Sequence, residues 1–280
     1  MSSSTRVVPV VVALLGIGAW GVYRFDRQSP DTPEPVESPT GAPAKPRVLT
    51  VAAASDLKFA LDEIVREFQA AQPDCEVKVS YGSSGNLFAQ LTNRAPFDLF
   101  FSADADYARK LVDSGEAQQT AFVYGRGRIV IWVRRDSPVD VEQLGVQAVL
   151  DPAVRKVAIA NPKHAPYGRA AEAALNELGV YDQVRQKLVL GENVAQTMQF
   201  VQTGAAEIGV ISHSLAVAPA LRDQGRFWEI PLDAYPPLEQ AGVILSWAKH
   251  RRAAESLRDF VLAADGREIL QRYGFLMPGE

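Results

Sequence analysis

The hydrophobic positions of residues 47–280 follow two alternating periodicities. Short apolar runs bounded by Gly, Ser, Asn or Pro predict strands, and apolar residues spaced three and four positions apart predict amphipathic helices. The pattern predicts strands over 48–53, 76–81, 98–102, 128–133, 157–160, 187–190, 208–212 and 243–247. It predicts helices over 57–68, 86–91, 107–112, 168–178, 195–203, 215–221, 254–263 and 267–273.

This alternation of strands and helices favours parallel sheets covered by helices, an α/β architecture. About 230 residues, roughly the length of one or two domains, form either one doubly wound sheet or two smaller lobes. In both arrangements ligands bind beyond the carboxyl ends of the strands, where the helices begin. The strand-to-helix turns are therefore the places to search for chemistry.

Four of these turns carry small or polar residues. They are AAASDL (52–57), YGSSGN (81–86), NPKHAPYG (161–168) and GENV (191–194). A helix N-terminus presents unpaired N–H groups and about +0.5 of a charge, so four converging termini supply roughly +2 before solvent screening. One such turn is typical of an ordinary cap or connection. The four together predict a site for a small dianion that needs neither Arg nor Lys.

The N-terminal part of the chain has a different character. Residues 7–23 contain no charge and are followed by Arg24, which is typical of a secretory signal or of a short membrane span. Residues 28–46 hold six of the chain's 18 prolines and almost no large apolar side chain, which predicts an extended spacer. We therefore expect a membrane anchor or signal segment over 1–27, with an uncleaved anchor favoured, a Pro-rich linker over 28–46, and an extracytoplasmic body.

Composition narrows the function classes. The chain has 280 residues, of which 47% are hydrophobic and 22% charged, values typical of globular proteins. Its net charge of −4 falls to −6 without residues 1–27, which argues against nucleic acid as a partner. One cysteine and three histidines without metal-ligand spacing predict no site for a free metal cation and no cofactor.

A catalytic reading rests on one partial motif. The segment 82–86 (GSSGN) nearly matches the G-x-S-x-G nucleophile elbow, but Asn86 stands in place of the last glycine. A serine hydrolase that used Ser84 would also need a base, either His213 or His250. We therefore expect a binding protein and not an enzyme, with a serine hydrolase as the less favoured alternative.

Six segments resemble one known family. They are VAAASDL (51–57), YGSSGNLFAQL (81–91), PFDLFFSAD (96–104), NPKHAPYG (161–168), AEIGVISHSLA (206–216) and RYGFLMP (272–278). In this order they resemble the periplasmic molybdate-binding proteins of ABC importers. The resemblance implies a type II periplasmic-binding-protein fold with two α/β lobes, each a mainly parallel sheet flanked by helices, and the ligand in the cleft. It implies lobes at 48–129 plus 243–280 and at 130–242, with hinge strands near 128–132 and 241–246.

The resemblance also implies a ligand set. In that family molybdate or tungstate is held by neutral donors, which correspond here to the hydroxyls of Ser55 and Ser84 and the backbone N–H groups of Asp56 and Val194. Many members have a tyrosine at the position of Ser212. Here we expect the hydroxyl to come from Tyr167 instead.

The Asp56 carboxylate leaves the ligand partly open. We expect it to face solvent or its own helix start, where negative charge is favoured. The alternative is that it accepts the proton of hydrogen phosphate, so a receptor for phosphate, sulfate or another small oxyanion remains open. The implied partner is an ABC permease, and we expect a monomer that meets the membrane only through its N-terminal segment. It is then periplasmic or extracytoplasmic, either tethered or secreted.

Overall fold

The computed structural model describes residues 47–117 and 120–279, which belong to one compact unit. Segments 1–27 and 28–46 lie outside the described residues, so the anchor or signal and the linker stay predictions. Within the described ranges, none of the helices combines the length and the apolar character that a bilayer crossing requires.

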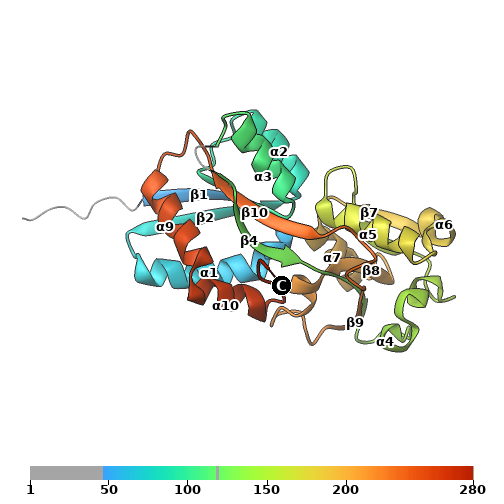
Figure 1. Ribbon diagram of the computed structural model, residues 1–280. Coiled ribbons are helices and arrows are strands. Elements are labelled where there is room, and N and C mark those ends of the chain that lie inside the picture. Colours follow the sequence, from blue (N-terminus) through green and yellow to red (C-terminus); the bar gives the residue numbers. More distant parts are fainter. Residues whose placement is uncertain (1–46, 118–119, 280) are drawn as a thin grey trace, which may run out of the picture. The chain divides into compact units, whose positions relative to one another are not determined.

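The first of two five-stranded sheets has the strand order β2-β1-β3-β10-β4 (Figure 1). Its strands are β1 (Arg47–Ala54), β2 (Cys75–Gly82), β3 (Leu99–Ser102), β4 (Phe122–Gly127) and β10 (Leu238–Ile244). Strand β1 pairs in parallel with β2 and β3, whereas β10 runs antiparallel to both β3 and β4. The parallel strands therefore end at the same edge, where the helices that follow them begin.

The second sheet has the order β7-β6-β8-β5-β9. Its strands are β5 (Ile129–Arg134), β6 (Val157–Ala160), β7 (Leu188–Gly191), β8 (Ile208–Ser212) and β9 (Gly225–Glu229). Strand β6 is parallel to β7 and β8, and β5 is antiparallel to β8 and β9. The two sheets thus share one plan of three parallel strands extended by antiparallel ones.

The chain passes between the sheets at two places in the described residues. Strand β4 leads into β5 through Arg128 alone, and β9 returns to β10 through residues 230–237. Strand β10 begins at Leu238 and pairs with β4 and β3, so residues 241–244 of the hinge strand expected at 241–246 lie inside the first sheet. The sequence pattern did not predict the start of β10 at Leu238, because the polar residues Glu239 and Gln240 follow it. The boundaries assigned to the two lobes stay a prediction.

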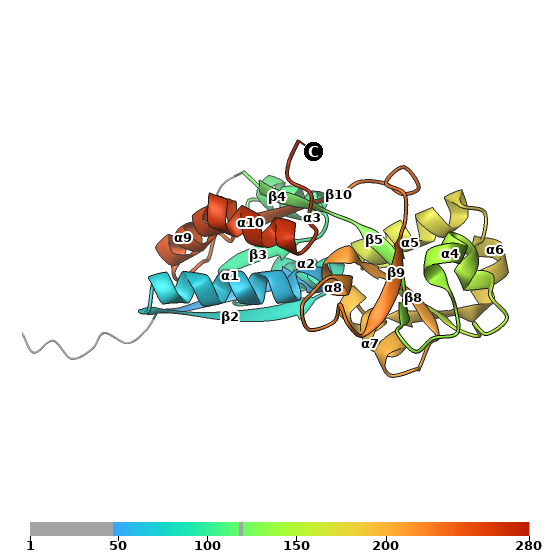
Figure 2. The same ribbon diagram turned by 90° about the horizontal axis from the view of Figure 1, so that it is seen from below.

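Helices cover both faces of the first sheet. They are the 3₁₀ helix η1 (Ser55–Leu57), α1 (Lys58–Ala71), α2 (Ser84–Thr92), α3 (Ala105–Asp113), α9 (Arg251–Leu262) and α10 (Ala264–Arg272). Figure 2 shows α9 and α10 beside α1. Strand alternation separates the two faces: Val51 packs in the cluster with Ile64 of α1, and Ala52 in the cluster with Leu87 of α2.

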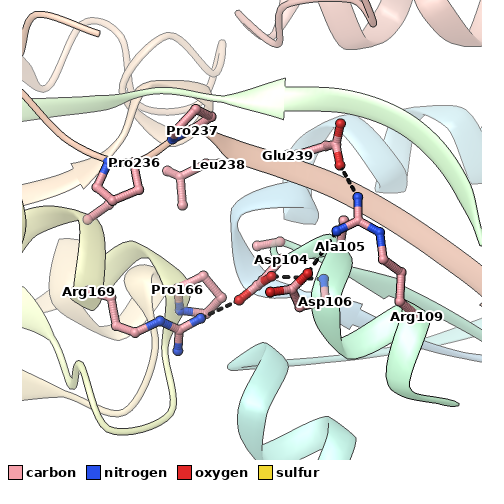
Figure 3. A pocket seen from close by; sticks show the side chains of 12 residues that line it. Asp104, Ala105, Asp106, Arg109, Pro166, Arg169, Pro236, Pro237, Leu238 and Glu239 are labelled. Carbon is pink, nitrogen blue, oxygen red and sulfur yellow. Dashed lines mark hydrogen bonds and ion pairs between the residues drawn. The ribbon is translucent and has the colours of Figure 1, made fainter. Parts of the chain in front are cut away.

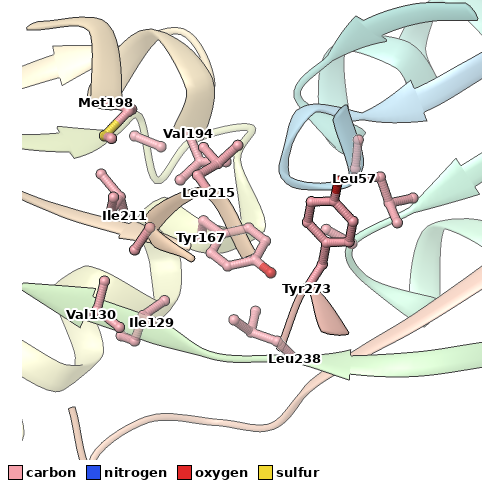
Figure 4. Packing of buried hydrophobic residues seen from close by; sticks show 14 of the residues in the cluster. Leu57, Ile129, Val130, Tyr167, Val194, Met198, Ile211, Leu215, Leu238 and Tyr273 are labelled. Atoms are coloured by element: carbon pink, nitrogen blue, oxygen red, sulfur yellow. The ribbon is translucent and has the colours of Figure 1, made fainter. Parts of the chain in front are cut away.

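The second sheet is covered by further helices. They are α4 (Val141–Leu144), η2 (Gly145–Leu150), α5 (Pro166–Glu177), α6 (Tyr181–Val184), η3 (Arg185–Lys187), α7 (Val194–Gln202) and α8 (His213–Ala216). Helices α5 and α7 both pack on β6 and β8. Their buried residues join the α1 face of the first sheet in one continuous apolar cluster, part of which Figure 4 shows. That continuity brings the start of α5 and α7 close to the first sheet.

The predicted α/β class and the two sheets are confirmed, while several element boundaries were wrong. The helix expected over 215–221 ends at Ala216, because Pro219 disfavours helical backbone in the residue before it. The strand expected over 243–247 lies at Leu238–Ile244. Strands β4 and β9 were missed, since glycine and arginine interrupt their apolar pattern.

Candidate functional site

All five predicted site residues line one small pocket between the two sheets. Ser55, Asp56 and Ser84 follow strands of the first sheet, and Tyr167 and Val194 follow strands of the second. Each of the five is at most 3% exposed. The cavity volume is about 10 Å³, which is about the volume needed for the centre of one water-sized group. The structure therefore brings the predicted residues together, while their contact with an anion stays a prediction.

Four helical segments begin at this pocket. Ser55 opens η1, which continues into α1, and Ser84 is the first residue of α2. Tyr167 is the second residue of α5, and Val194 is the first residue of α7. The first N–H groups of a helix have no partner inside it, and its N-terminal end carries partial positive charge. The four strand-to-helix turns of the sequence thus converge as the anion-site argument requires.

The two serine hydroxyls are fixed by backbone donors. Oγ of Ser84 accepts a hydrogen bond from the N–H of Ala103 at 2.9 Å, and Oγ of Ser55 accepts from the N–H of Ala195 at 3.4 Å. Each of these bonds uses an oxygen lone pair and leaves the hydroxyl proton available to a third group. Both serines therefore suit an occupant that accepts hydrogen bonds.

The Asp56 carboxyl is buried in the wall of the pocket. Its Oδ2 accepts hydrogen bonds from the Tyr167 hydroxyl at 2.9 Å and from Nε2 of Gln240 at 2.8 Å. Its Oδ1 is also buried and has no hydrogen-bond partner among the described residues. Burial raises the pKa of this carboxyl to about 6, while hydrogen bonds from Gln240 and Tyr167 lower it, as do the nearby backbone N–H groups of Asp56 and Leu57, which form no hydrogen bond to Oδ1. Asp56 was expected to face solvent or its own helix start. Its burial excludes solvent, and the orientation toward the helix start stays a prediction.

Tyr167 contributes to the same hydrogen-bond group. Its hydroxyl donates to Asp56 and accepts from Nε2 of Gln240 at 3.0 Å. Burial, followed by the charge of Asp56, raises the pKa of Tyr167 well above its usual value, so the hydroxyl stays protonated. A tyrosine has one hydroxyl proton, and in this arrangement that proton is directed to Asp56. Figure 4 shows the ring beside Val194 and Leu215, with the hydroxyl turned away from Ile211.

Gln240 was missed by sequence reasoning. It is fully buried on β10, and its Oε1 accepts a hydrogen bond from the Tyr124 hydroxyl at 2.9 Å. A Cβ added to Gly127 would overlap the Tyr167 hydroxyl and lie 2.7 Å from Nε2 of Gln240, so only glycine leaves room there. The available signal was one uncharged polar residue beside the apolar positions 241–245. That signal does not distinguish a buried glutamine from one at the surface.

Further contacts connect the two sheets beside the pocket. The N–H of Gly85 donates to the carbonyl of His164 at 2.9 Å, and Oγ of Ser83 lies 3.0 Å from Nδ1 of His164. Ser83 itself lines the pocket. A Cβ on Gly85 would approach the His164 carbonyl oxygen to 2.5 Å, so this close approach requires glycine. The first turn of α2 and the turn before α5 are therefore in direct backbone contact.

A larger cavity of about 530 Å³ opens next to the pocket and shares Ala103 and Pro166 with it. Figure 3 shows Arg169 directed at Asp104 and Arg109 directed at Glu239 across this cavity. Each of these arginines is paired with a carboxylate. The lining of this cavity therefore presents no unbalanced positive charge.

The remaining sequence candidates lie elsewhere. Ser212 is buried, with Oγ 3.1 Å from Oγ of Ser214, and it does not line the pocket. Nε2 of His213 lies 3.2 Å from a carboxylate oxygen of Glu229, and no histidine hydrogen-bonds to Ser84 among the described residues. Residues 47–117 and 120–279 contain no cluster of three His, Cys, Asp or Glu that could hold a metal ion. The geometry thus favours anion binding over the serine chemistry of the partial motif.

Comparisons with known proteins agree with this geometry. The chain is 36% identical to the molybdate-binding protein ModA of Rhodobacter capsulatus, over 71% of this chain and 77% of that protein. It is 34% identical to the molybdate-binding protein ModA of Azotobacter vinelandii, over 80% of this chain and 88% of that protein. The solved structure of the Azotobacter vinelandii periplasmic molybdate-binding protein matches with a TM-score of 0.76 and 29% identity, covering 82% and 99% of the two chains.

The family comparison covers nearly the whole described body. The sequence model of the family described as bacterial extracellular solute-binding protein matches residues 49–276. That range contains both sheets and all five residues that line the pocket. The chain belongs to the family of bacterial extracellular solute-binding proteins.

Proposed function

We propose that this chain captures molybdate in the pocket between its two sheets and delivers it to an ABC permease outside the cytoplasm. The observation that carries the proposal is the convergence of four helix starts and two hydroxyls on one buried pocket. Helix N-termini hold anions through N–H groups and partial charge, without a basic side chain. Relatives named as molybdate-binding proteins support the choice of anion.

The proposed contacts follow from the positions of the residues. Ser55 and Ser84 donate their hydroxyl protons, and the backbone N–H groups of Asp56 and Val194 donate from helix starts. In place of the expected hydrogen bond to the anion, Tyr167 lines the pocket and holds Asp56 through its hydroxyl. Tungstate belongs to the same proposal, because it is also a tetrahedral dianion and the donors do not distinguish the metal.

The proposal extends to the rest of the chain. Residues 1–27 hold the protein at the membrane or direct its secretion, and residues 28–46 form the spacer between that segment and the body. The protein acts as a monomer that delivers its anion to the permease. Molecular mass in solution and membrane fractionation of cells that express the full chain test these two points.

The test of the proposal is calorimetric titration of the full chain with molybdate, tungstate, sulfate and phosphate. We expect dissociation constants on the order of micromolar or tighter for molybdate and tungstate, and weaker binding of sulfate. Trp132 on β5 and Trp247 after β10 provide a parallel fluorescence signal. Tight binding of phosphate without binding of molybdate contradicts the choice of anion. Turnover of simple esters contradicts the assignment as a binding protein.

A further inference from the structure

The Asp56 carboxyl contains one oxygen that the protein leaves without a hydrogen bond. Its Oδ2 accepts from two donors, Tyr167 and Gln240, whereas Oδ1 accepts from none among the described residues. Asp56 is 1% exposed and lines the pocket. Buried polar atoms almost always have a partner, and an exception points to a missing ligand, water or proton.

An anion in the pocket would bring a second negatively charged oxygen close to Oδ1 of Asp56. A carboxylate oxygen and an oxygen of a dianion repel each other, and burial strengthens the repulsion because the local dielectric is low. One proton between them converts the repulsion into a short, charge-assisted O–H···O bond. Such a bond also satisfies the one oxygen that Tyr167 and Gln240 do not reach.

We propose that this pocket binds its dianion together with one proton, which is held between Oδ1 of Asp56 and an oxygen of the anion. The inference rests on the proposed function, because it requires an oxyanion in this pocket. The balance is simple: the carboxylate, the dianion and one proton from water form the complex, and no bond to the central atom of the anion forms or breaks. An anion that arrives already protonated gives the same complex.

The surroundings of Asp56 allow it to gain this proton near neutral pH. Burial holds its pKa at about 6, two units closer to neutrality than the usual 3.8. The titratable groups that face it are Tyr167 from α5 and Tyr124 from β4, and burial raises the pKa of both well above the usual value. Both therefore stay neutral, and Gln240 from β10 and Ser214 from α8 do not titrate. The proton exchanges at Asp56.

Two other titratable side chains lie close to the pocket, and the experiment must distinguish their effect on proton uptake from that of Asp56. His164 contacts the pocket residue Ser83, with Nδ1 at 3.0 Å from Oγ. Lys58 follows η1 on α1 and forms an ion pair with Asp62 at 3.1 Å. Because His164 contacts a residue that lines the pocket, the experiment includes a variant without this histidine.

A shared proton also predicts which oxyanions the site accepts. The bond is strong when the anion's oxygens are basic, as in molybdate, tungstate or phosphate, and weak for the much less basic sulfate. Discrimination then depends on proton affinity as well as on cavity size. The substrate class is the tetrahedral oxyanions of weak acids.

The test counts protons during molybdate binding to the full chain. Calorimetry from about pH 5.5 to about pH 8.5, in buffers of different ionisation enthalpy, gives both affinity and proton uptake. The wild-type chain is expected to take up about one proton near pH 8 and to lose about tenfold in affinity per pH unit above pH 7. Asp56→Asn, whose amide donates without titrating, is expected to take up none and to bind with little pH dependence. His164→Gln is expected to keep the proton uptake of the wild type.

The outcomes separate this inference from the proposed function. Molybdate binding by the wild type without proton uptake overturns the shared proton and leaves the proposed function standing. Proton uptake that persists in Asp56→Asn and disappears in His164→Gln assigns the proton to the histidine and also overturns the inference. Absence of molybdate binding by both the wild type and Asp56→Asn overturns the proposed function, and the inference with it.

Discussion

The Tyr167 hydroxyl donates a hydrogen bond to Oδ2 of Asp56 at 2.9 Å, which joins a helix on the second sheet to the turn after β1 on the first. Gln240 bonds to both partners from the first sheet. All three side chains are at most 3% exposed. The joint between the sheets at this pocket is therefore a buried hydrogen-bond group centred on one carboxyl.

The Tyr167→Phe variant removes one of the two donors to Asp56. The ionised carboxyl then loses stabilisation, so the pKa of Asp56 rises further. The free energy of unfolding near pH 7.5 is expected to fall by about 1–2 kcal/mol, because Asp56 is ionised there and keeps only Gln240. Urea unfolding measures this change. The control is Tyr181→Phe, whose hydroxyl bonds to Glu172 at a half-buried site on α6. Equal losses in the two variants would contradict the role given to Tyr167.

The Ser84→Ala variant tests the proposed hydroxyl donors. It removes a hydroxyl whose oxygen is held by the Ala103 N–H and whose proton is available to the anion. Hydrogen bonds to charged groups contribute about 1.5–3 kcal/mol, so molybdate affinity is expected to fall by roughly 10- to 100-fold. Isothermal titration measures the loss. Ser256→Ala, on the outer part of α9, is the matched control and is expected to bind as the wild type does. Unchanged affinity in Ser84→Ala would remove Ser84 from the ligand set.

The Gly85→Ala variant tests the close approach of the two turns. Alanine favours the helical backbone of α2, but its Cβ would lie 2.5 Å from the His164 carbonyl oxygen. The fold is expected to persist while the turns separate, so molybdate affinity falls at least about tenfold, or about 1.4 kcal/mol. Titration and circular dichroism together report affinity and helix content. Gln90→Ala, on the exposed side of the same helix, serves as the control, and wild-type affinity in Gly85→Ala would show that the approach is dispensable.

The Asp56→Asn variant is expected to stabilise the ligand-free chain above pH 6. Folding raises the pKa of Asp56 from 3.8 to about 6, so the folded chain holds its proton more tightly than the unfolded chain does. The wild type therefore loses stability as pH rises through this window, by about 3 kcal/mol in full. We expect Asp56→Asn to gain about 2–3 kcal/mol near pH 7.5 and about 1 kcal/mol near pH 4.5. Urea denaturation at both pH values measures the difference, and an equal gain at both would exclude the titration as its cause.

His213 has the opposite effect on stability. Burial, then the charge of Arg128, lowers the pKa of His213 to about 4, against the raising effect of Glu229. The unfolded chain takes up this proton near pH 6.5 and the folded chain only near pH 4, so the wild type loses stability as pH falls between them. Between pH 7 and pH 4.5 the free energy of unfolding of the wild type is expected to fall by on the order of 2 kcal/mol because of His213. His213→Gln is expected to abolish this part of the fall, and urea unfolding at the two pH values measures it. His250→Gln is the control, because His250 lies away from His213, Arg128 and Glu229. Equal loss of stability in acid by His213→Gln and the wild type would show that His213 is not its cause.

The local part of the site was readable from the sequence. Ser55, Ser84, Tyr167 and Val194 stand at strand-to-helix turns, and turns of this kind share one edge of a parallel sheet. In the structure all four residues line one pocket. The periodicities that predicted the helices and strands depend only on neighbours in the chain, so they can be recognised without knowledge of the fold.

Other features depended on residues far apart in the chain. Gln240 reaches Asp56 across 184 positions, and no local pattern specifies that its amide is buried. The burial of Asp56 was missed for the same reason, since helix-start chemistry says nothing of a partner far away in the chain. Strand β10 begins earlier than predicted, because the exposed Glu239 and the buried Gln240 interrupt the apolar pattern near its start.

The sequence by itself determined the α/β class and the strand-to-helix turns that line the pocket, because each is set by spacing and residue type over a few positions. Only the tertiary structure decided that the Tyr167 proton goes to Asp56, that Oδ1 of this carboxyl is left without a partner, and that Gly85 and Gly127 lie where a Cβ would collide. These are properties of distances between segments, and such distances are fixed only when the two sheets pack against each other.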